Sequence, residues 1–188
     1  MDFASTLANA ANSANPGSDT VAVMYLGYDA PNNLAYASGP GFAARGAEGL
    51  ADFTTGLEAT NQDAPNITNI GHRYGAVAVA QADQYGSGSS ADSVVLIGAP
   101  GPGEGIDHAN DFRVGEDNVY VLNTDEDPIN AAGIAGIHGS DVTDPSFGAT
   151  RLDAGEGQHM SYFDPQSDAF GNLVEVITGN AQNATPHQ

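Results

Sequence analysis

The residues with the clearest chemical potential lie in the pentapeptide Gly71–Gly75, which reads Gly-His-Arg-Tyr-Gly. It follows the short apolar stretch Ile67–Ile70 and precedes the Ala- and Val-rich stretch Ala76–Gln84. A strand, a G-x-x-x-G turn and a helix of small residues form the layout of a nucleophile elbow, which presents its central side chain on a strained backbone. The pattern therefore predicts that Arg73 occupies the position where an active enzyme carries serine.

The neighbours of Arg73 have distinct expected roles. The flanking glycines, Gly71 and Gly75, are expected to avoid clashes in the tight turn. The backbone N–H of Tyr74 is expected to point toward the space above the turn, where it can help to hold an oxyanion. We expect His72 to be structural. Because a guanidinium is not deprotonated in proteins, Arg73 is no acyl nucleophile.

An acid and a base follow in the order that this elbow requires, which is nucleophile, acid, histidine. Asp127 comes directly after the predicted strand Asn118–Leu122, and His159 lies in a late loop. A carboxylate in this position would orient the imidazole and stabilise the imidazolium. The sequence thus predicts Asp127 as the acid and His159 as the base, with Asp125 as a weaker candidate for the acid.

Arg73 admits three accounts: a natural loss of activity, a substitution introduced to inactivate the protein, or a changed function. Two roles for its side chain stay open at this point. It could pair with Asp127 as a structural ion pair in the vacated site. It could instead bind an anion, aided by the N-terminus of the helix that follows the turn.

Other chemistries are not predicted, and we expect neither a metal nor a cofactor. A histidine- and aspartate-rich set has no zinc-motif spacing. The acidic turn after the fourth predicted strand lacks the glycine and distal glutamate of a calcium loop, and a glycine-rich turn lacks the ending of a phosphate loop. That last turn is better interpreted as the rim of a pocket. The acidic turn is Asp125–Asp127, and the glycine-rich turn is Gly98–Gly103. The histidine- and aspartate-rich set consists of His108, His138, Asp107, Asp111 and Asp141.

Composition limits the classes of partner. The 188 residues carry a formal net charge of −20, no cysteine and no lysine, so disulfides and thiol chemistry are excluded. The four arginines are scattered, which argues against nucleic acid and anionic membranes as partners. No apolar run spans a bilayer, and residues 1–16 do not resemble a secretory signal. We expect a soluble protein from a high-salt environment, with a small ester or acyl ligand.

The elements that would position these residues alternate between strand and helix, which predicts an α/β fold with a mainly parallel sheet and helices on both faces. We expect one domain over residues 1–188, with residues 1–20 forming a helical segment and a turn. Polar turns follow three of the strands, where sites of such sheets lie. The predicted strands are Val21–Leu26, Ile67–Ile70, Ser93–Ile97 and Asn118–Leu122, and the predicted helices are Asp2–Ala14, Phe42–Thr60, Ala76–Gln84 and Asp168–Thr178.

From about Val21 onward the chain resembles the actinobacterial α/β-hydrolases of uncharacterised function whose elbow reads GHSYG. The matching segments are Tyr25–Pro31, Gly71–Gly75, Gly98–Gly101, Asp107–Ala109, Asp127–Ile129, His138–Gly139, Asp144–Ala149, His159–Tyr162 and Asn172–Leu173. The resemblance implies a serine-esterase or lipase type of activity on carboxylic esters, with the nucleophile position on Arg73, the acid on Asp127 and the base on His159. It also implies a first strand with a Val-Pro-Gly-like loop, for which we find no counterpart before Val21.

Overall fold

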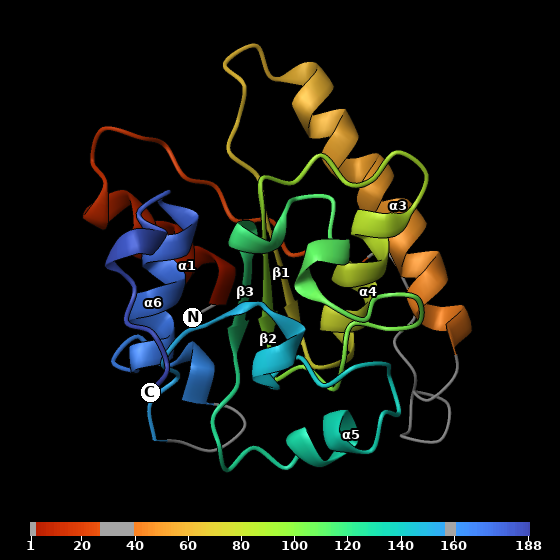
Figure 1. Cartoon of the computed structure of the whole chain (residues 1–188). Helices are drawn as coiled ribbons and strands as arrows, with labels where there is room; N and C mark the ends of the chain where they lie inside the picture. Colours follow the sequence, from red (N-terminus) through yellow and green to blue (C-terminus); the bar gives the residue numbers. More distant parts are fainter. Residues whose placement is uncertain (1–2, 27–39, 157–160) are drawn as a thin grey trace.

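A four-stranded parallel sheet organises the protein, in the order β1-β2-β3-β4 (Figure 1). The computed structural model describes residues 3–26, 40–156 and 161–188. The strands are β1 (Thr68–His72), β2 (Ser93–Ile97), β3 (Val119–Leu122) and the two-residue β4 (Thr150–Arg151). Almost every residue of β2 and β3 is buried, because both faces of the sheet are covered.

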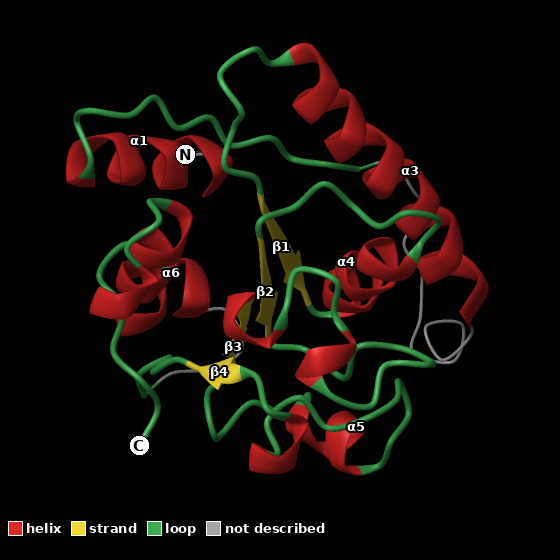
Figure 2. Ribbon diagram, turned by 45° about the horizontal axis from the view of Figure 1, so that its top comes forward, coloured by secondary structure: helices red, strands yellow, loops and turns green. Residues whose placement is uncertain are grey.

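Helices cover both faces of the sheet, as Figures 1 and 2 show. On one face, α3 (Pro40–Thr60) packs against α4 (Tyr74–Gln84), and their buried side chains meet Val94, Leu96 and Val121 of the sheet. On the other face, α1 (Phe3–Ala14) and α6 (Asp168–Ile177) enclose a second core with Val95, Ile97 and Leu122. The short helix α5 (Asn130–Ile134) lies beyond the carboxyl ends of the strands. Single 3₁₀ turns occur at Ala109–Asp111, Glu116–Asn118, Pro145–Phe147, Ser161–Phe163 and Ala181–Asn183.

The predicted α/β class, the parallel sheet and the two helical layers are confirmed. Three predicted strands and all four predicted helices are present, with ends that differ by no more than two residues. Two of these shifts affect the site: β1 extends to His72 and α4 begins at Tyr74, so Arg73 is the single residue between them. None of the described helices is both long enough and apolar enough to cross a membrane.

The prediction that Val21–Leu26 is a buried strand is wrong. This segment pairs with none of the described strands, and Val21 and Leu26 are each 81% exposed. Only Tyr25 packs well, with its ring 5.6 Å from that of Phe53 on α3. An apolar, β-branched run favours a strand only where neighbours accept its backbone hydrogen bonds and cover its side chains. Here the described sheet begins at β1, so these neighbours are lacking among the described residues.

The stretch from Asn130 to Gln158 shows no periodicity in the sequence, yet besides the 3₁₀ turn Pro145–Phe147 it contains a helix and a strand that the sequence did not predict. Helix α5 spans only five residues, and β4 spans two. Neither is long enough to complete two turns of apolar periodicity or a clear alternation. β4 is recognised only by its ladder with β3, in which Tyr120 and Val121 pair with Thr150 and Arg151.

Candidate active site of a strand–turn–helix elbow

Arg73 is the single residue between β1 and α4, and its backbone adopts a conformation that is rare for L-residues. Its φ is 56° and its ψ is −125°. Its N–H donates to the carbonyl of Ile97 at 3.0 Å, and its own carbonyl accepts from the N–H of Ala76 at 2.9 Å. The turn is therefore fixed on both sides, by the sheet and by the first turn of the helix. Among the described residues, Arg73 and Ala64 are the only residues other than glycine that have a positive φ. Within the pentapeptide, the backbone strain therefore lies at the predicted tip.

The two glycines of the pentapeptide are not equivalent. A Cβ added to Gly71 would lie 2.5 Å from the Cα of Ala76 and 2.6 Å from the carbonyl oxygen of Gly75, both of which are backbone atoms. A Cβ added to Gly75 would meet no described atom within 4 Å. The steric requirement that we expected of both glycines therefore rests on Gly71, which lets α4 pack closely against the end of β1.

The residues on either side of Arg73 anchor the turn to opposite layers of the fold. The hydroxyl of Tyr74 accepts a hydrogen bond from the N–H of Ala43 near the start of α3, at 3.1 Å. Burial raises the pKa of Tyr74 above its ordinary value, and this hydrogen bond lowers it by less. His72 packs on the other face, with its ring centroid 4.7 Å from that of Phe163 and 6.3 Å from that of Tyr162. This geometry fits the structural role that we expected for His72.

Asp127 is buried, with 3% of its surface exposed, in the turn that follows β3. One carboxylate oxygen accepts a hydrogen bond from the hydroxyl of Tyr162 at 2.7 Å, and the other accepts from the N–H of Ile129 at 2.9 Å. The same hydroxyl accepts from the N–H of Thr124 at 2.9 Å. Burial, as the main cause, raises the pKa of Tyr162 to about 12, so the phenol stays a donor to Asp127 at neutral pH.

The weaker candidate, Asp125, lies in a different environment. Its side chain is 74% exposed and forms ion pairs with Arg151 at 3.3 Å and with His187 at 3.4 Å. Asp127 is thus the buried member of the two acid candidates, and its role as the acid stays a prediction. The Arg73–Asp127 ion pair stays a prediction.

His159, the predicted base, lies outside the described residues. The nearest described residues after it, Ser161–Phe163, form the 3₁₀ turn that carries Tyr162. Tyr162 contacts the ring of His72 and donates to Asp127, so a continuous path of contacts joins the elbow to the acid. Sequence reasoning missed Tyr162. A buried tyrosine needs a partner for its hydroxyl, but the sequence gives no sign of which one.

The loops around the elbow are held together by amide side chains and by glycines. Asn123 accepts from the N–H of Ala99 at 3.0 Å and donates to the side chain of Asn130 at 3.0 Å. The N–H of Gly103 donates to the carbonyl of His138 at 2.7 Å, and the ring of His138 lies 5.6 Å from that of Tyr74. Burial lowers the pKa of His138. The loop after β2 is thus a packed rim, which fits the interpretation of Gly98–Gly103.

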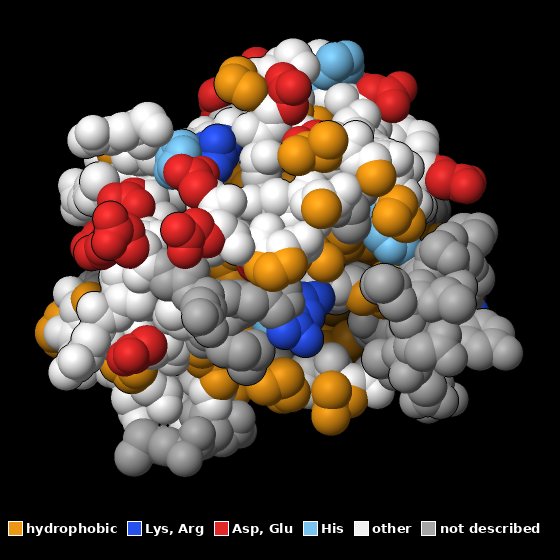
Figure 3. Space-filling model, turned by 90° about the horizontal axis from the view of Figure 1, so that it is seen from below, with side chains coloured by type: hydrophobic (Ala, Val, Ile, Leu, Met, Phe, Trp, Pro, Cys, Tyr) orange, Lys and Arg blue, Asp and Glu red, His pale blue; other side chains and the backbone are white. Residues whose placement is uncertain are grey.

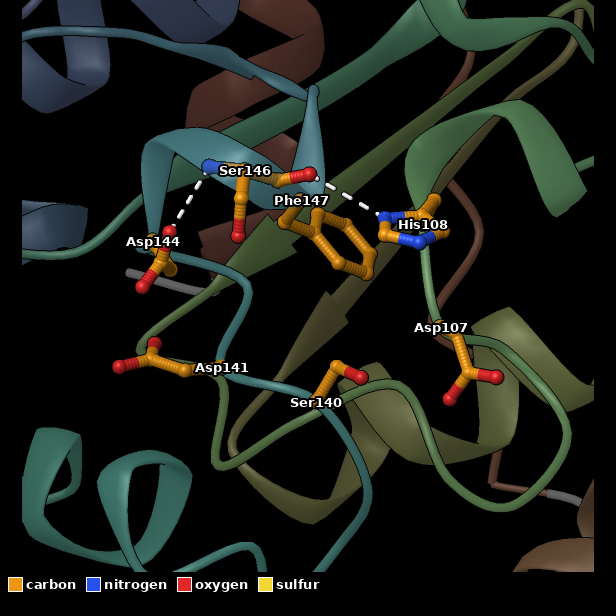
Figure 4. Close-up of a pocket in the computed structure, with 7 residues that line it drawn as sticks. All are labelled: Asp107, His108, Ser140, Asp141, Asp144, Ser146 and Phe147. Atoms are coloured by element: carbon orange, nitrogen blue, oxygen red, sulfur yellow. Dashed lines mark hydrogen bonds between the residues drawn. The ribbon is translucent and has the colours of Figure 1, made fainter.

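A cavity of about 250 Å³ opens beside this rim, between the loop after β2 and the loop at Ser140–Phe147 (Figure 4). In its wall the Nδ1 atom of His108 lies 3.2 Å from the carbonyl oxygen of Ser146, and Asp144 accepts from the N–H of Ser146 at 2.8 Å. The elbow does not contribute to its lining, which consists of Asp107, His108, Ser140, Asp141, Asp144, Ser146 and Phe147. Within the described part of the chain, no three His, Asp or Glu side chains gather as a metal site.

Comparison with known proteins places this geometry in a family. A family model described as Alpha/beta hydrolase matches residues 1–136. The chain belongs to the α/β-hydrolase family. This membership confirms the fold that the resemblance implied, and the parallel sheet with helices on both faces agrees with it.

The relatives are actinobacterial, as the resemblance implied. The uncharacterized protein Rv2079 of Mycobacterium tuberculosis is 31% identical over 95% of this chain, which corresponds to 32% of that protein. The uncharacterized protein Rv0963c of the same species is 34% identical over 76% of this chain and 53% of its own length, as is Mb0988c of Mycobacterium bovis. The chain therefore spans about a third to a half of these relatives. No solved structure matches it significantly.

Proposed function

We propose that this α/β-hydrolase domain derives from serine esterases that act on carboxylic esters, and that it binds an acyl ligand without hydrolysing it. The observation that carries the proposal is Arg73 itself, which stands at the strained tip of an otherwise intact elbow with a φ of 56°. The backbone conformation that would present a serine nucleophile is kept, and the nucleophile is replaced by a cation. A guanidinium does not attack an acyl carbon.

The same replacement supports binding at this position. Arg73 is exposed beyond the end of β1, at the carboxyl edge of the sheet, where ligands of α/β folds bind. A carboxylate or an ester carbonyl would meet the guanidinium there, and the N–H of Tyr74 at the start of α4 is a second donor in the same turn. Asp127 and His159 would then persist as parts of the site wall, without a nucleophile to activate.

Reversion of the elbow tests this proposal. The chain is compared with Arg73→Ser for hydrolysis of short p-nitrophenyl esters and for labelling by an organophosphonate that reports an activated serine. We expect neither activity from the chain itself. In Arg73→Ser we expect labelling and slow turnover, and both should be lost when His159→Ala is added. Arg73→Gln is the matched control, because it removes the charge without adding a nucleophile.

Two results would contradict the proposal. Hydrolysis or labelling by the unaltered chain would reveal a nucleophile elsewhere. An Arg73→Ser variant that folds but is labelled no more than Arg73→Gln would show that Asp127 and His159 do not form a catalytic pair with this position, and the esterase lineage would then lack support.

We further infer that the domain is adapted to high salt. With Asp and Glu totalling 24 and Lys and Arg totalling 4, its acidic side chains repel one another across the surface. Molar salt shortens the screening length to about 3 Å and removes most of that repulsion. The melting temperature should therefore rise from low salt to molar NaCl. A melting temperature that is flat or falls over this series would count against the adaptation.

A further inference from the structure

The segment Val21–Leu26 gathers large apolar side chains that the described structure leaves in water. Its side chains include Val21 and Leu26, each 81% exposed, Val23 at 58% and Met24 at 52%. In Figure 2 the segment belongs to the loop that leads from α1 toward α3. The four exposed residues occupy both odd and even positions, so a strand formed here would be apolar on both of its faces.

Helices of the fold hold both ends of this segment. At its start, the N–H of Thr20 donates to the side-chain oxygen of Asn12 on α1 at 2.6 Å, and the side-chain amide of Asn12 donates to the carbonyl of Thr20 at 2.9 Å. Near its end, the ring of Tyr25 packs on that of Phe53 on α3. Between these anchors, no described residue forms a hydrogen bond with the backbone of residues 21–24. A backbone that is already held at both ends loses less conformational entropy when it pairs with another strand.

The edge of the sheet at β4 is treated differently. There the C-terminal segment lies alongside the chain: the N–H of Asp153 donates to the carbonyl of Thr185 at 2.9 Å, and the N–H of His187 donates to the carbonyl of Arg151 at 3.0 Å. Such coverage occupies backbone groups that would otherwise pair with another chain. Within the described part of the protein, nothing covers residues 21–24 in this way, so their backbone groups are available to a partner.

We propose that two copies of the chain associate through this segment, with Val21–Leu26 of one copy paired antiparallel to Val21–Leu26 of the other. A two-fold axis makes a strand its own antiparallel partner, so one contact satisfies backbone groups in both copies. A largely exposed Val, Leu or Met side chain offers roughly 100 Å² of apolar surface. With four such side chains in each copy and the backbone between them, the contact approaches the area of about 1,000 Å² that a specific interface needs.

Charge favours this segment over other surfaces as the contact between two copies. The chain has a formal net charge of −20, yet no charged side chain occurs from Thr20 to Leu26. On the face shown in Figure 3, by contrast, acidic side chains gather toward one side, where a second copy would be repelled. Charges outside the contact still repel each other over the Debye length, which is about 10 Å at 0.1 M salt and about 3 Å at 1 M. The dimer should therefore be tighter in molar salt than in low salt.

Sedimentation velocity of the full chain, over a concentration series in low salt and in molar NaCl, measures the association. The double variant Val21→Lys with Val23→Lys places like charges across the paired strands, which is destabilising. The matched control is Ile134→Lys with Ile137→Lys, which makes the same change in net charge at side chains that are 78% and 50% exposed elsewhere on the surface. We expect the valine variant to raise the dissociation constant about tenfold or more and the control to leave it unchanged. Thermal melts verify that both variants fold.

Cross-linking locates the contact independently. Because the chain contains no cysteine, a single introduced cysteine can form a disulfide only with the same residue of a second copy. Val23 is near the middle of the segment, where antiparallel pairing about a two-fold axis brings equivalent residues together. We expect Val23→Cys to give a covalent dimer under mild oxidation in molar NaCl, and Ile134→Cys, the matched control, to stay monomeric.

Three results would overturn the inference. The first is a chain that stays monomeric in molar NaCl up to its solubility limit, which would leave the segment to another partner. The second is a dimer that the valine variant weakens no more than the isoleucine control does. The third is cross-linking of Ile134→Cys that equals or exceeds that of Val23→Cys, because the copies would then meet at another surface.

Discussion

The elbow and the acid turn belong to the same candidate site but are stabilised in opposite ways. At the elbow, Arg73 has an exposed side chain on a strained backbone with a φ of 56°. In the acid turn, Asp127 has a buried carboxylate on a backbone without positive φ, and its oxygens accept from Tyr162 and Ile129. The fold thus depends on the shape of the elbow and on the chemical identity of Asp127.

This difference predicts how the two positions respond to substitution. The elbow is specified by the close contact of Gly71 with Ala76 and by backbone hydrogen bonds of Arg73, none of which involves the Arg73 side chain. We therefore expect a substitution that keeps this backbone conformation to preserve the shape of the turn. Loss of the Asp127 carboxylate, by contrast, would leave buried donors without an acceptor, which should destabilise the fold.

The largest effect should come from Gly71→Ala. Its Cβ would overlap the backbone of α4, and the helix has to move away from the end of β1. We expect a loss of about 3 kcal/mol in the free energy of unfolding. Gly75→Ala is the matched control and should change stability by less than about 0.5 kcal/mol, since its Cβ meets nothing described. Chemical denaturation measures both. Equal losses from the two substitutions would show that the elbow shape does not depend on Gly71.

Tyr162→Phe addresses the acid turn. It removes the donor to Asp127 and the acceptor of the Thr124 N–H, which should cost about 1–3 kcal/mol. The pKa of Tyr162 is raised to about 12, so the folded state holds this proton more tightly than the unfolded state does. The stability that this contributes is present below the ordinary pKa of tyrosine, near 10, and is lost as the pH rises toward 12.

Denaturation at neutral and alkaline pH, with phenol absorbance as a second readout, tests the Tyr162 assignment. The Phe variant should lose the phenol that titrates near pH 12 and part of the alkaline loss of stability. If the variant is as stable as the parent at neutral pH, Asp127 does not need this hydrogen bond, and the contrast between the elbow and the acid turn weakens.

The smallest effects are expected at Arg73. Arg73→Gly removes the strain of a non-glycine residue at positive φ and should raise the free energy of unfolding by about 1 kcal/mol. Arg73→Ser keeps the strain and should stay within about 0.5 kcal/mol of the parent. Thermal and chemical denaturation distinguish the two. A large loss in Arg73→Ser would mean that the guanidinium holds the fold together, which would favour the structural ion pair.

Much of the site was visible in the sequence because local rules govern it. A G-x-x-x-G turn between an apolar strand and a small-residue helix can hardly take another shape, and its strained tip falls on Arg73 as predicted. The buried strands β2 and β3 are continuous apolar runs, so their prediction needed no tertiary information. Asp127 was preferred to Asp125 from its place directly after β3, whereas the burial that distinguishes the two depends on residues far along the chain.

Tertiary structure alone decided the rest. Val21–Leu26 is the counterexample to local rules, since its composition is that of a buried strand and the described sheet offers it no partner. Tyr162 and Asp127 are 35 residues apart, and only the packing of the loop against the turn after β3 makes them partners. The sequence by itself determined the turn, the arginine at its tip and the excess of acidic residues, because these follow from neighbouring residues and composition. Only the tertiary structure shows which side chains are buried together, because the burial of a segment depends on the other segments that pack against it.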